Sequence, residues 1–196
     1  MDSSTPAALD DAGRVLPSAP QARIIAASLE LFATHGVGGT SLQMIADEIG
    51  VTKAAVYHQF RTKEEIVVAA AEAELARLAQ VVEVAEEQRS RKRARDVLLS
   101  GIVQLAVDRR RSVGTILSDP VIVGFFADHA YFQDLMHRLR RVLTGDDDRP
   151  EAHVRTAMLL AAVSGAVMHP IVQDLDDATL REQLLRLARR FLGLPA

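Results

Sequence analysis

The side chains best suited to chemistry gather in one short segment, residues 51–63, with the sequence VTKAAVYHQFRTK. Lys53 supplies a cation, Tyr57 a phenolic hydroxyl and His58 an imidazole. Such groups bind phosphate oxygens and the edges of bases, so the segment could contact nucleic acid. This chemistry requires a helix that presents these side chains to solvent, and the residues before and within the segment predict one.

Two short helices joined by a tight turn are predicted over residues 40–63. Ser41 can cap the first helix, because a serine hydroxyl accepts an early backbone N–H. Gly50 follows where the chain needs a positive φ, which glycine adopts without a steric penalty. The first helix has an apolar stripe at helical spacing, formed by Leu42, Ile45, Ala46 and Ile49.

The second helix is expected to start after Thr52, which can cap it, and to bury Val56 and Phe60. Val51 fills the corner, and Ala46 is small where the two helices touch. This combination is typical of a helix-turn-helix, which places its second helix in the DNA major groove. The alternative is an ordinary helical hairpin with a glycine turn. The polar outer face of the second helix favours DNA binding.

The same region resembles the tetracycline-repressor-like (TetR) family of regulators. Residues 51–67, VTKAAVYHQFRTKEEIV, are similar to that family's recognition helix and the start of its next helix. Residues 22–50, ARIIAASLELFATHGVGGTSLQMIADEIG, are similar to its first two helices. The resemblance implies an N-terminal three-helix DNA-binding domain followed by a helical domain for effector binding and dimerisation.

Within the DNA-binding domain we expect each exposed residue to take a role. Thr40 and Ser41 would donate to phosphate near the start of the helix that Ser41 caps. Ala55 would touch a thymine methyl group, and His58 would contact phosphate or a base edge. The remaining expected phosphate contacts are Thr52, Lys53, Tyr57 and Lys63, and Arg61 is a weaker candidate.

The overall composition is that of an ordinary globular protein. The chain has 196 residues, of which 48% are hydrophobic and 25% charged. It has no cysteine, which excludes disulfides and cysteine-based zinc sites. The sequence contains no apolar run of about 20 residues, so no membrane span is predicted. The first residues lack a signal-peptide pattern, so we expect a cytoplasmic protein.

The charge of the DNA-binding domain is unusual for its expected partner. The whole chain carries −3, and residues 20–65 hold four Lys and Arg against five Asp and Glu, a net charge of −1. Binding must then depend on helix N-termini and a few well-placed cations. We therefore expect modest affinity from a monomer and useful affinity from a dimer on double-stranded DNA.

The sequence predicts an all-α chain of about nine helices. Residues 1–19 read as a disordered arm, residues 20–65 as the helix-turn-helix domain and residues 66–196 as the effector-binding and dimerisation domain. Helices are expected at 22–35, 63–87, 97–107, 121–143 and 151–169, with a last helix capped by Asp176 or Asp177 and reaching residue 192. The basic run 88–95 reads as a solvated helix junction, with a second DNA contact or an anionic effector site as alternatives.

The last two helices, about residues 151–192, are expected to form a homodimer interface. Small residues at 157–166 let helices approach closely, and leucines on the last helix add apolar area. A monomeric core is the alternative, because small residues also pack inside proteins. A two-fold dimer implies a near-palindromic operator.

The resemblance also implies a cavity for a small effector that releases a repressor from DNA. The scarcity of polar groups at apolar positions favours an apolar or weakly polar effector. Each candidate lining residue could equally be plain core. The candidates are Leu78, Ile102, Leu105, Ile116, Phe125, Phe126, Phe132, Met136, Met158 and Leu159.

Two other classes of protein remain as alternatives. One is a DNA-binding adaptor whose helical domain holds a protein partner. The other is a helical enzyme, which the absence of a GxSxG, P-loop or HExxH motif disfavours. Because the histidines are scattered and no recognised zinc spacing occurs, neither a metal nor a cofactor is expected.

Overall fold

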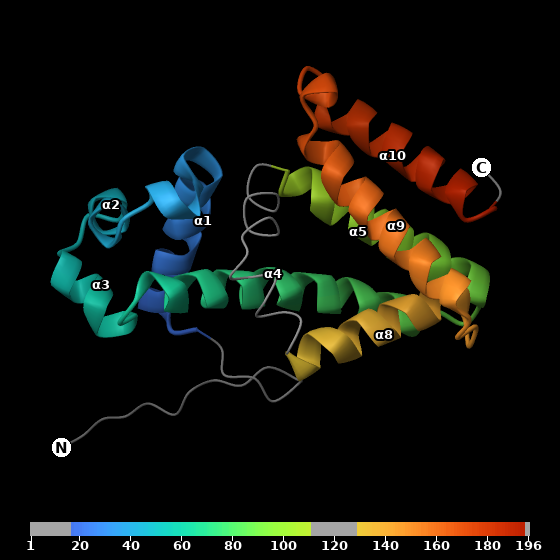
Figure 1. Ribbon diagram of the computed structural model, residues 1–196, viewed down its shortest axis with the longest axis horizontal. Coiled ribbons are helices and arrows are strands. Elements are labelled where there is room, and N and C mark those ends of the chain that lie inside the picture. The colour runs from blue at the N-terminus through green and yellow to red at the C-terminus, as the bar shows by residue number, and fades with distance from the viewer. Residues whose placement is uncertain (1–16, 111–128, 195–196) are drawn as a thin grey trace. The chain divides into compact units, whose positions relative to one another are not determined.

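The computed structural model describes residues 17–110 and 129–194, and every regular element in these ranges is helical. Eight α-helices and one short 3-10 helix lie there, and their labels follow Figure 1. The predicted all-α class is confirmed. The chain divides into two compact units, Met1–Ala70 and Ala71–Ala196, so the division falls within α4 (Lys63–Glu86).

The first unit is built from α1 (Ala19–Gly39), α2 (Leu42–Glu48), α3 (Lys53–Gln59) and the first turns of α4. Helix α1 begins with a capping box, in which the Ser18 hydroxyl accepts from the Gln21 N–H and the Gln21 side chain accepts from the Ser18 N–H. Gly36 interrupts α1 with a φ of 72°. The core consists of fully or almost fully buried side chains, among them Ile24, Leu29, Phe32, Ile45, Val56, Phe60 and Ile66.

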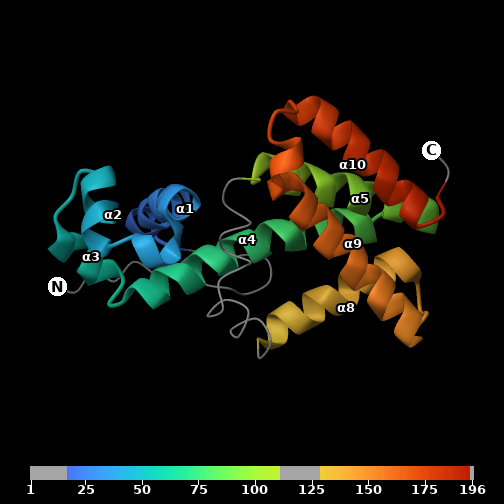
Figure 2. The same cartoon turned by 45° about the horizontal axis from the view of Figure 1, so that its top comes forward.

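The second unit contains the rest of α4, α5 (Arg91–Asp108), α8 (Ala130–Thr144), α9 (Pro150–Met168), the 3-10 helix η1 (Pro170–Val172) and α10 (Asp177–Phe191). Helices α5 and α10 lie side by side in both views (Figures 1 and 2). Arg189 pairs with Asp96 near one end of this contact, and Arg181 pairs with Asp108 near the other. Arg138 of α8 and Glu86 of α4 form a further pair, with Nη2 2.6 Å from Oε2.

Three predicted helix boundaries differ from those in the structure. Helix α1 begins at Ala19, so the predicted arm over residues 1–19 ends too late, and its residues 1–16 lie outside the described ranges. Helix α5 begins at Arg91, six residues before the predicted start, because the Ser90 hydroxyl caps the Arg93 N–H at 3.3 Å. The predicted helix 121–143 is wrong as one element, since extended His129 precedes the start of α8.

Among the described residues, no helix is both long and apolar enough to span a membrane. Of the two predicted caps of the last helix, Asp176 and Asp177, the structure shows Asp176, whose carboxylate accepts from the Thr179 N–H at 2.9 Å. The same carboxylate accepts from the Thr179 hydroxyl, and these hydrogen bonds hold the pKa of Asp176 below its usual range.

Candidate nucleic-acid interface

The turn between α2 and α3 has the geometry that its sequence predicts. Gly50 has a φ of 69°, and the Val51 N–H donates to the Ala46 carbonyl at 2.9 Å. Ala46 and Val56 are both fully buried. A small residue on α2 and a valine on α3 therefore lie in the core of the first unit while the glycine turns the chain between the helices.

Ser41 and Thr52 cap the two helices as predicted. The Ser41 hydroxyl accepts from the Met44 N–H, and the Thr52 hydroxyl accepts from the Ala55 N–H, both at 3.2 Å. Each hydroxyl keeps its own hydrogen for another acceptor. Both residues are exposed, so each remains available to the phosphate contact expected of it.

The exposed face of α3 consists of Lys53, Ala54, Ala55, Tyr57 and His58, which surround the buried Val56 in sequence. Lys53 Nζ lies 5.6 Å from the centre of the Tyr57 ring, a cation–π distance. This contact limits the freedom of both side chains before any ligand arrives. The structure thus brings the predicted residues of α3 together on one solvent-facing surface.

Two predicted phosphate contacts occupy different places from those expected. Thr40 is only 2% exposed, and its hydroxyl donates to the Gly36 carbonyl at 2.8 Å. Thr40 therefore closes the end of α1, and the expected donation to phosphate is incompatible with this placement. Lys63 is half-buried, and its ammonium donates to the carbonyls of Val37 at 2.9 Å and of Thr40 at 3.2 Å.

Two polar residues of this unit make contacts that the sequence did not predict. The Arg23 guanidinium donates to the Ile49 carbonyl at 3.2 Å, which ties α1 to the C-terminal end of α2. Gln43 is exposed in the first turn of α2, and its amide donates to Asp47 at 2.7 Å. The available signal for Gln43 was its polar character beside the apolar stripe. Arg23 gave no such signal, because its acceptor is a backbone atom 26 residues away.

The candidate effector-lining residues divide into four groups. Ile102 and Leu159 are buried core residues. Leu78, Leu105, Phe132 and Met136 are half-buried in the second unit. Ile116, Phe125 and Phe126 lie outside the described residues. Met158 is 55% exposed, so the prediction that it lines an internal cavity is wrong for this structure. It lies about 100° around α9 from its neighbour, the buried Leu159, and this rotation directs it to solvent.

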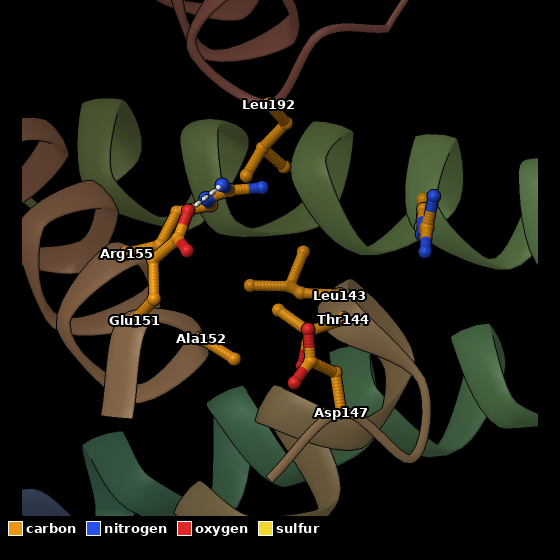
Figure 3. A pocket seen from close by; sticks show the side chains of 8 residues that line it. Leu143, Thr144, Asp147, Glu151, Ala152, Arg155 and Leu192 are labelled. Carbon is orange, nitrogen blue, oxygen red and sulfur yellow. Dashed lines mark hydrogen bonds and ion pairs between the residues drawn. The ribbon is translucent and has the colours of Figure 1, made fainter. Parts of the chain in front are cut away.

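A small cavity of about 90 Å³ lies elsewhere in the second unit (Figure 3). Glu151 pairs with Arg155 at 2.6 Å, and the dashed line in Figure 3 marks this contact. Asp147 pairs with Arg149, whose hydrogen bonds hold the pKa of the Asp147 carboxyl far below its usual range. The cavity shares no lining residue with the predicted effector site. It is lined by Arg95, Leu143, Thr144, Asp147, Glu151, Ala152, Arg155 and Leu192.

Helices α9 and α10 expose apolar side chains that the second unit does not cover. Met158 on α9 and Leu187 on α10 are each more than half exposed. Gly165 of α9 has open space where a Cβ would lie, so packing within the unit does not require a glycine there. We call the exposed apolar side chains of Val154, Met158, Leu187 and Phe191 the α9–α10 surface.

Comparison with known proteins agrees with this geometry. Residues 24–70 match the family described as "Bacterial regulatory proteins, tetR family". A stretch of 50 residues is 44% identical to the uncharacterized HTH-type transcriptional regulator YerO of Bacillus subtilis (strain 168). That stretch is 26% of this chain and spans only 17% of YerO.

Solved structures extend the likeness to most of the chain. The TetR family transcriptional regulator PfmR from Thermus thermophilus superposes with a TM-score of 0.70 at 20% identity, covering 89% of this chain and 99% of PfmR. SmeT, solved as a complex with triclosan, gives 0.65 at 22% identity, covering 88% of this chain and 91% of SmeT.

The capped helix pair with an exposed, polar second helix is a helix-turn-helix unit, joined to a second all-helical unit. Residues 24–70 match the TetR family, and the fold of the chain is that of solved TetR-family regulators.

Proposed function

We propose that the protein is a sequence-specific, DNA-binding transcriptional regulator. The observation that carries this proposal is the exposed face of α3, where Lys53, Tyr57 and His58 stand together on a helix capped at Thr52. On DNA, α3 lies in the major groove, with Lys53, Tyr57 and the cap hydroxyls of Ser41 and Thr52 on phosphates. The Ala55 methyl group and the His58 imidazole face the base edges.

The active form proposed is a homodimer through the last two helices, about residues 151–192. Support comes from the α9–α10 surface and from the open space at Gly165, which would let a second copy approach α9 closely. A two-fold dimer presents two copies of α3 to successive major grooves about one helical turn apart. The second copy also compensates for the net charge of −1 on residues 20–65 by doubling the phosphate contacts.

The proposed regulation is release from DNA by a small molecule that binds the predicted effector domain, residues 66–196. Half-buried Leu78, Leu105, Phe132 and Met136 favour an apolar or weakly polar effector. The related SmeT was solved with triclosan, which shows that this fold holds such a molecule in that protein. Repression is the proposed outcome, because a protein bound at an operator blocks polymerase until the effector lowers its affinity. Its proposed place of action is the cytoplasm.

The experiment that tests the function is selection of bound sequences from a random duplex library. The full-length protein is used at about 50 and about 200 mM salt, since non-specific binding falls steeply over this range. We expect a near-palindromic motif that survives the higher salt, with half-sites about 10 base pairs apart. Binding that yields no motif and disappears at the higher salt would reject sequence-specific recognition. A palindrome would support the dimer at the same time.

A further inference from the structure

Lys63 makes a bridge that neither its sequence position nor its charge predicts. Its ammonium donates to two backbone carbonyls, those of Val37 and Thr40, at 2.9 and 3.2 Å. Val37 belongs to the last turn of α1, and Thr40 precedes the Ser41 cap of α2. Lys63 is the first residue of α4, so one side chain joins the start of α4 to the connection between α1 and α2.

This connection is held by side-chain donors as well as by its own backbone. Gly36 breaks the helix with its positive φ, and its carbonyl accepts from the Thr40 hydroxyl. The Thr40 N–H donates to the Val37 carbonyl at 3.4 Å, a long distance for a hydrogen bond, so this contact is weak. Hydrogen bonds from a charged donor are about twice as strong as neutral ones, so the Lys63 contacts are the strongest at this connection.

Helix α2 is consequently fixed at both ends by cations from its neighbours. Lys63 donates to the Thr40 carbonyl, just before the N-terminal cap of α2. Arg23 of α1 donates to the Ile49 carbonyl at the C-terminal end of α2. A helix of seven residues makes few internal hydrogen bonds, so its orientation depends on such external contacts. The angle of α2 in turn fixes α3, because buried Ala46 and Val56 pack between them.

We propose that Lys63 is a positioning residue, whose ammonium clamps the α1–α2 connection and so sets the orientation in which α3 meets DNA. The inference rests on the proposed function, because orientation matters only if α3 reads DNA. Its effect is on discrimination: a loosened connection lets α3 adopt several angles, which weakens the base contacts that need one geometry more than the phosphate contacts.

The test uses full-length Lys63→Met, which keeps the aliphatic stem and removes the donors, and Lys63→Arg, which keeps a charged donor. Lys53→Met is the matched control, because it removes the same charge from the exposed face of α3. Amide hydrogen exchange is measured without DNA. Affinity for the selected sequence and for random DNA is measured over a range of salt, well below the unfolding temperature.

For Lys63→Met we expect amide exchange at residues 40–45 to rise by about tenfold to a hundredfold, the equilibrium effect of losing charged hydrogen bonds. The affinity ratio of selected to random DNA falls, the salt dependence stays the same, and Lys63→Arg recovers part of the ratio. Lys53→Met leaves the exchange unchanged and lowers the salt slope by about one.

Three results would overturn the proposal. Equal loss on both DNAs with a lower salt slope and unchanged exchange would make Lys63 a phosphate contact. Faster exchange with an unchanged affinity ratio would make the bridge purely structural. Unchanged exchange and affinity would leave the bridge without effect. If the wild type does not discriminate selected from random DNA, the proposed function fails, and the exchange data alone decide whether Lys63 clamps the connection.

Discussion

Gly101 of α5 faces Val81 of α4 so closely that a methyl group on Gly101 would overlap Cγ1 of Val81 and lie 3.2 Å from its Cγ2. The contact lets two helices of the second unit approach at a point where any other residue would separate them. Valine cannot turn aside easily, because a β-branched side chain in a helix has one preferred rotamer.

We therefore predict that Gly101→Ala lowers the free energy of unfolding by about 1–3 kcal/mol, the usual effect of overpacking. Chemical denaturation monitored by circular dichroism measures it. The double variant Gly101→Ala/Val81→Ala should recover most of the loss, because the second change removes the overlapping methyl groups. Additive losses in the double variant would contradict this explanation.

The positive φ of Gly50 makes a second prediction. Gly50→Ala should destabilise the first unit by about 1 kcal/mol, because a Cβ disfavours the left-handed conformation even where space is free. Gly38→Ala is the matched control: Gly38 has equally open surroundings without a positive φ, so alanine should leave stability equal or raise it. Thermal unfolding of both variants gives the comparison, and equal shifts would refute the strain at Gly50.

The N-terminal cap of α3 can be tested by Thr52→Ala. Losing the hydroxyl leaves the Ala55 N–H without its side-chain acceptor, and we expect a loss of about 1 kcal/mol in stability. Thr34→Ala serves as the control, because Thr34 lies within α1 and its hydroxyl only donates to the Glu30 carbonyl. There alanine, the better helix former, should not destabilise the protein. A similar loss for both would show that the cap contributes nothing specific.

The α9–α10 surface predicts the response of the oligomer to a charge. Leu187→Arg should convert the proposed dimer to monomers at micromolar concentration, because it buries an unpaired cation in the interface. Val84→Arg changes a similarly exposed residue of α4 and should leave the mass unchanged. Light scattering coupled to gel filtration distinguishes the two. A dimer that persists in Leu187→Arg would place the interface elsewhere.

The sequence was most informative where a local rule determines the structure. Ser41, Gly50 and Thr52 were each assigned correctly, because caps and positive-φ turns depend on a residue's own chemistry and its near neighbours. For α10 the sequence left Asp176 and Asp177 as alternative caps, and the structure shows Asp176. The predicted start of a helix was wrong where the residue that caps it was not recognised, as at Ser90.

The sequence was least informative about contacts between distant residues. Lys63 was expected on phosphate because it is a cation at the start of a helix, whereas its acceptors lie 26 and 23 residues away. Thr40 was expected at the surface but is buried by the same connection. Met158 and Leu159 are adjacent in sequence and apolar, and only packing distinguishes the exposed side chain from the buried one. Such differences arise from tertiary structure, which composition and periodicity do not encode locally.

The central claim is that the exposed face of α3 contacts DNA, and a salt titration of Lys53→Ala tests it most directly. Affinity of the wild type and the variant is measured for the selected sequence and for random DNA, with Arg141→Ala, an exposed cation of α8, as the control. We predict that Lys53→Ala weakens binding to both DNAs about equally and lowers the salt slope by about one, while Arg141→Ala has no effect. Wild-type affinity and slope in Lys53→Ala would contradict the placement of α3 on DNA.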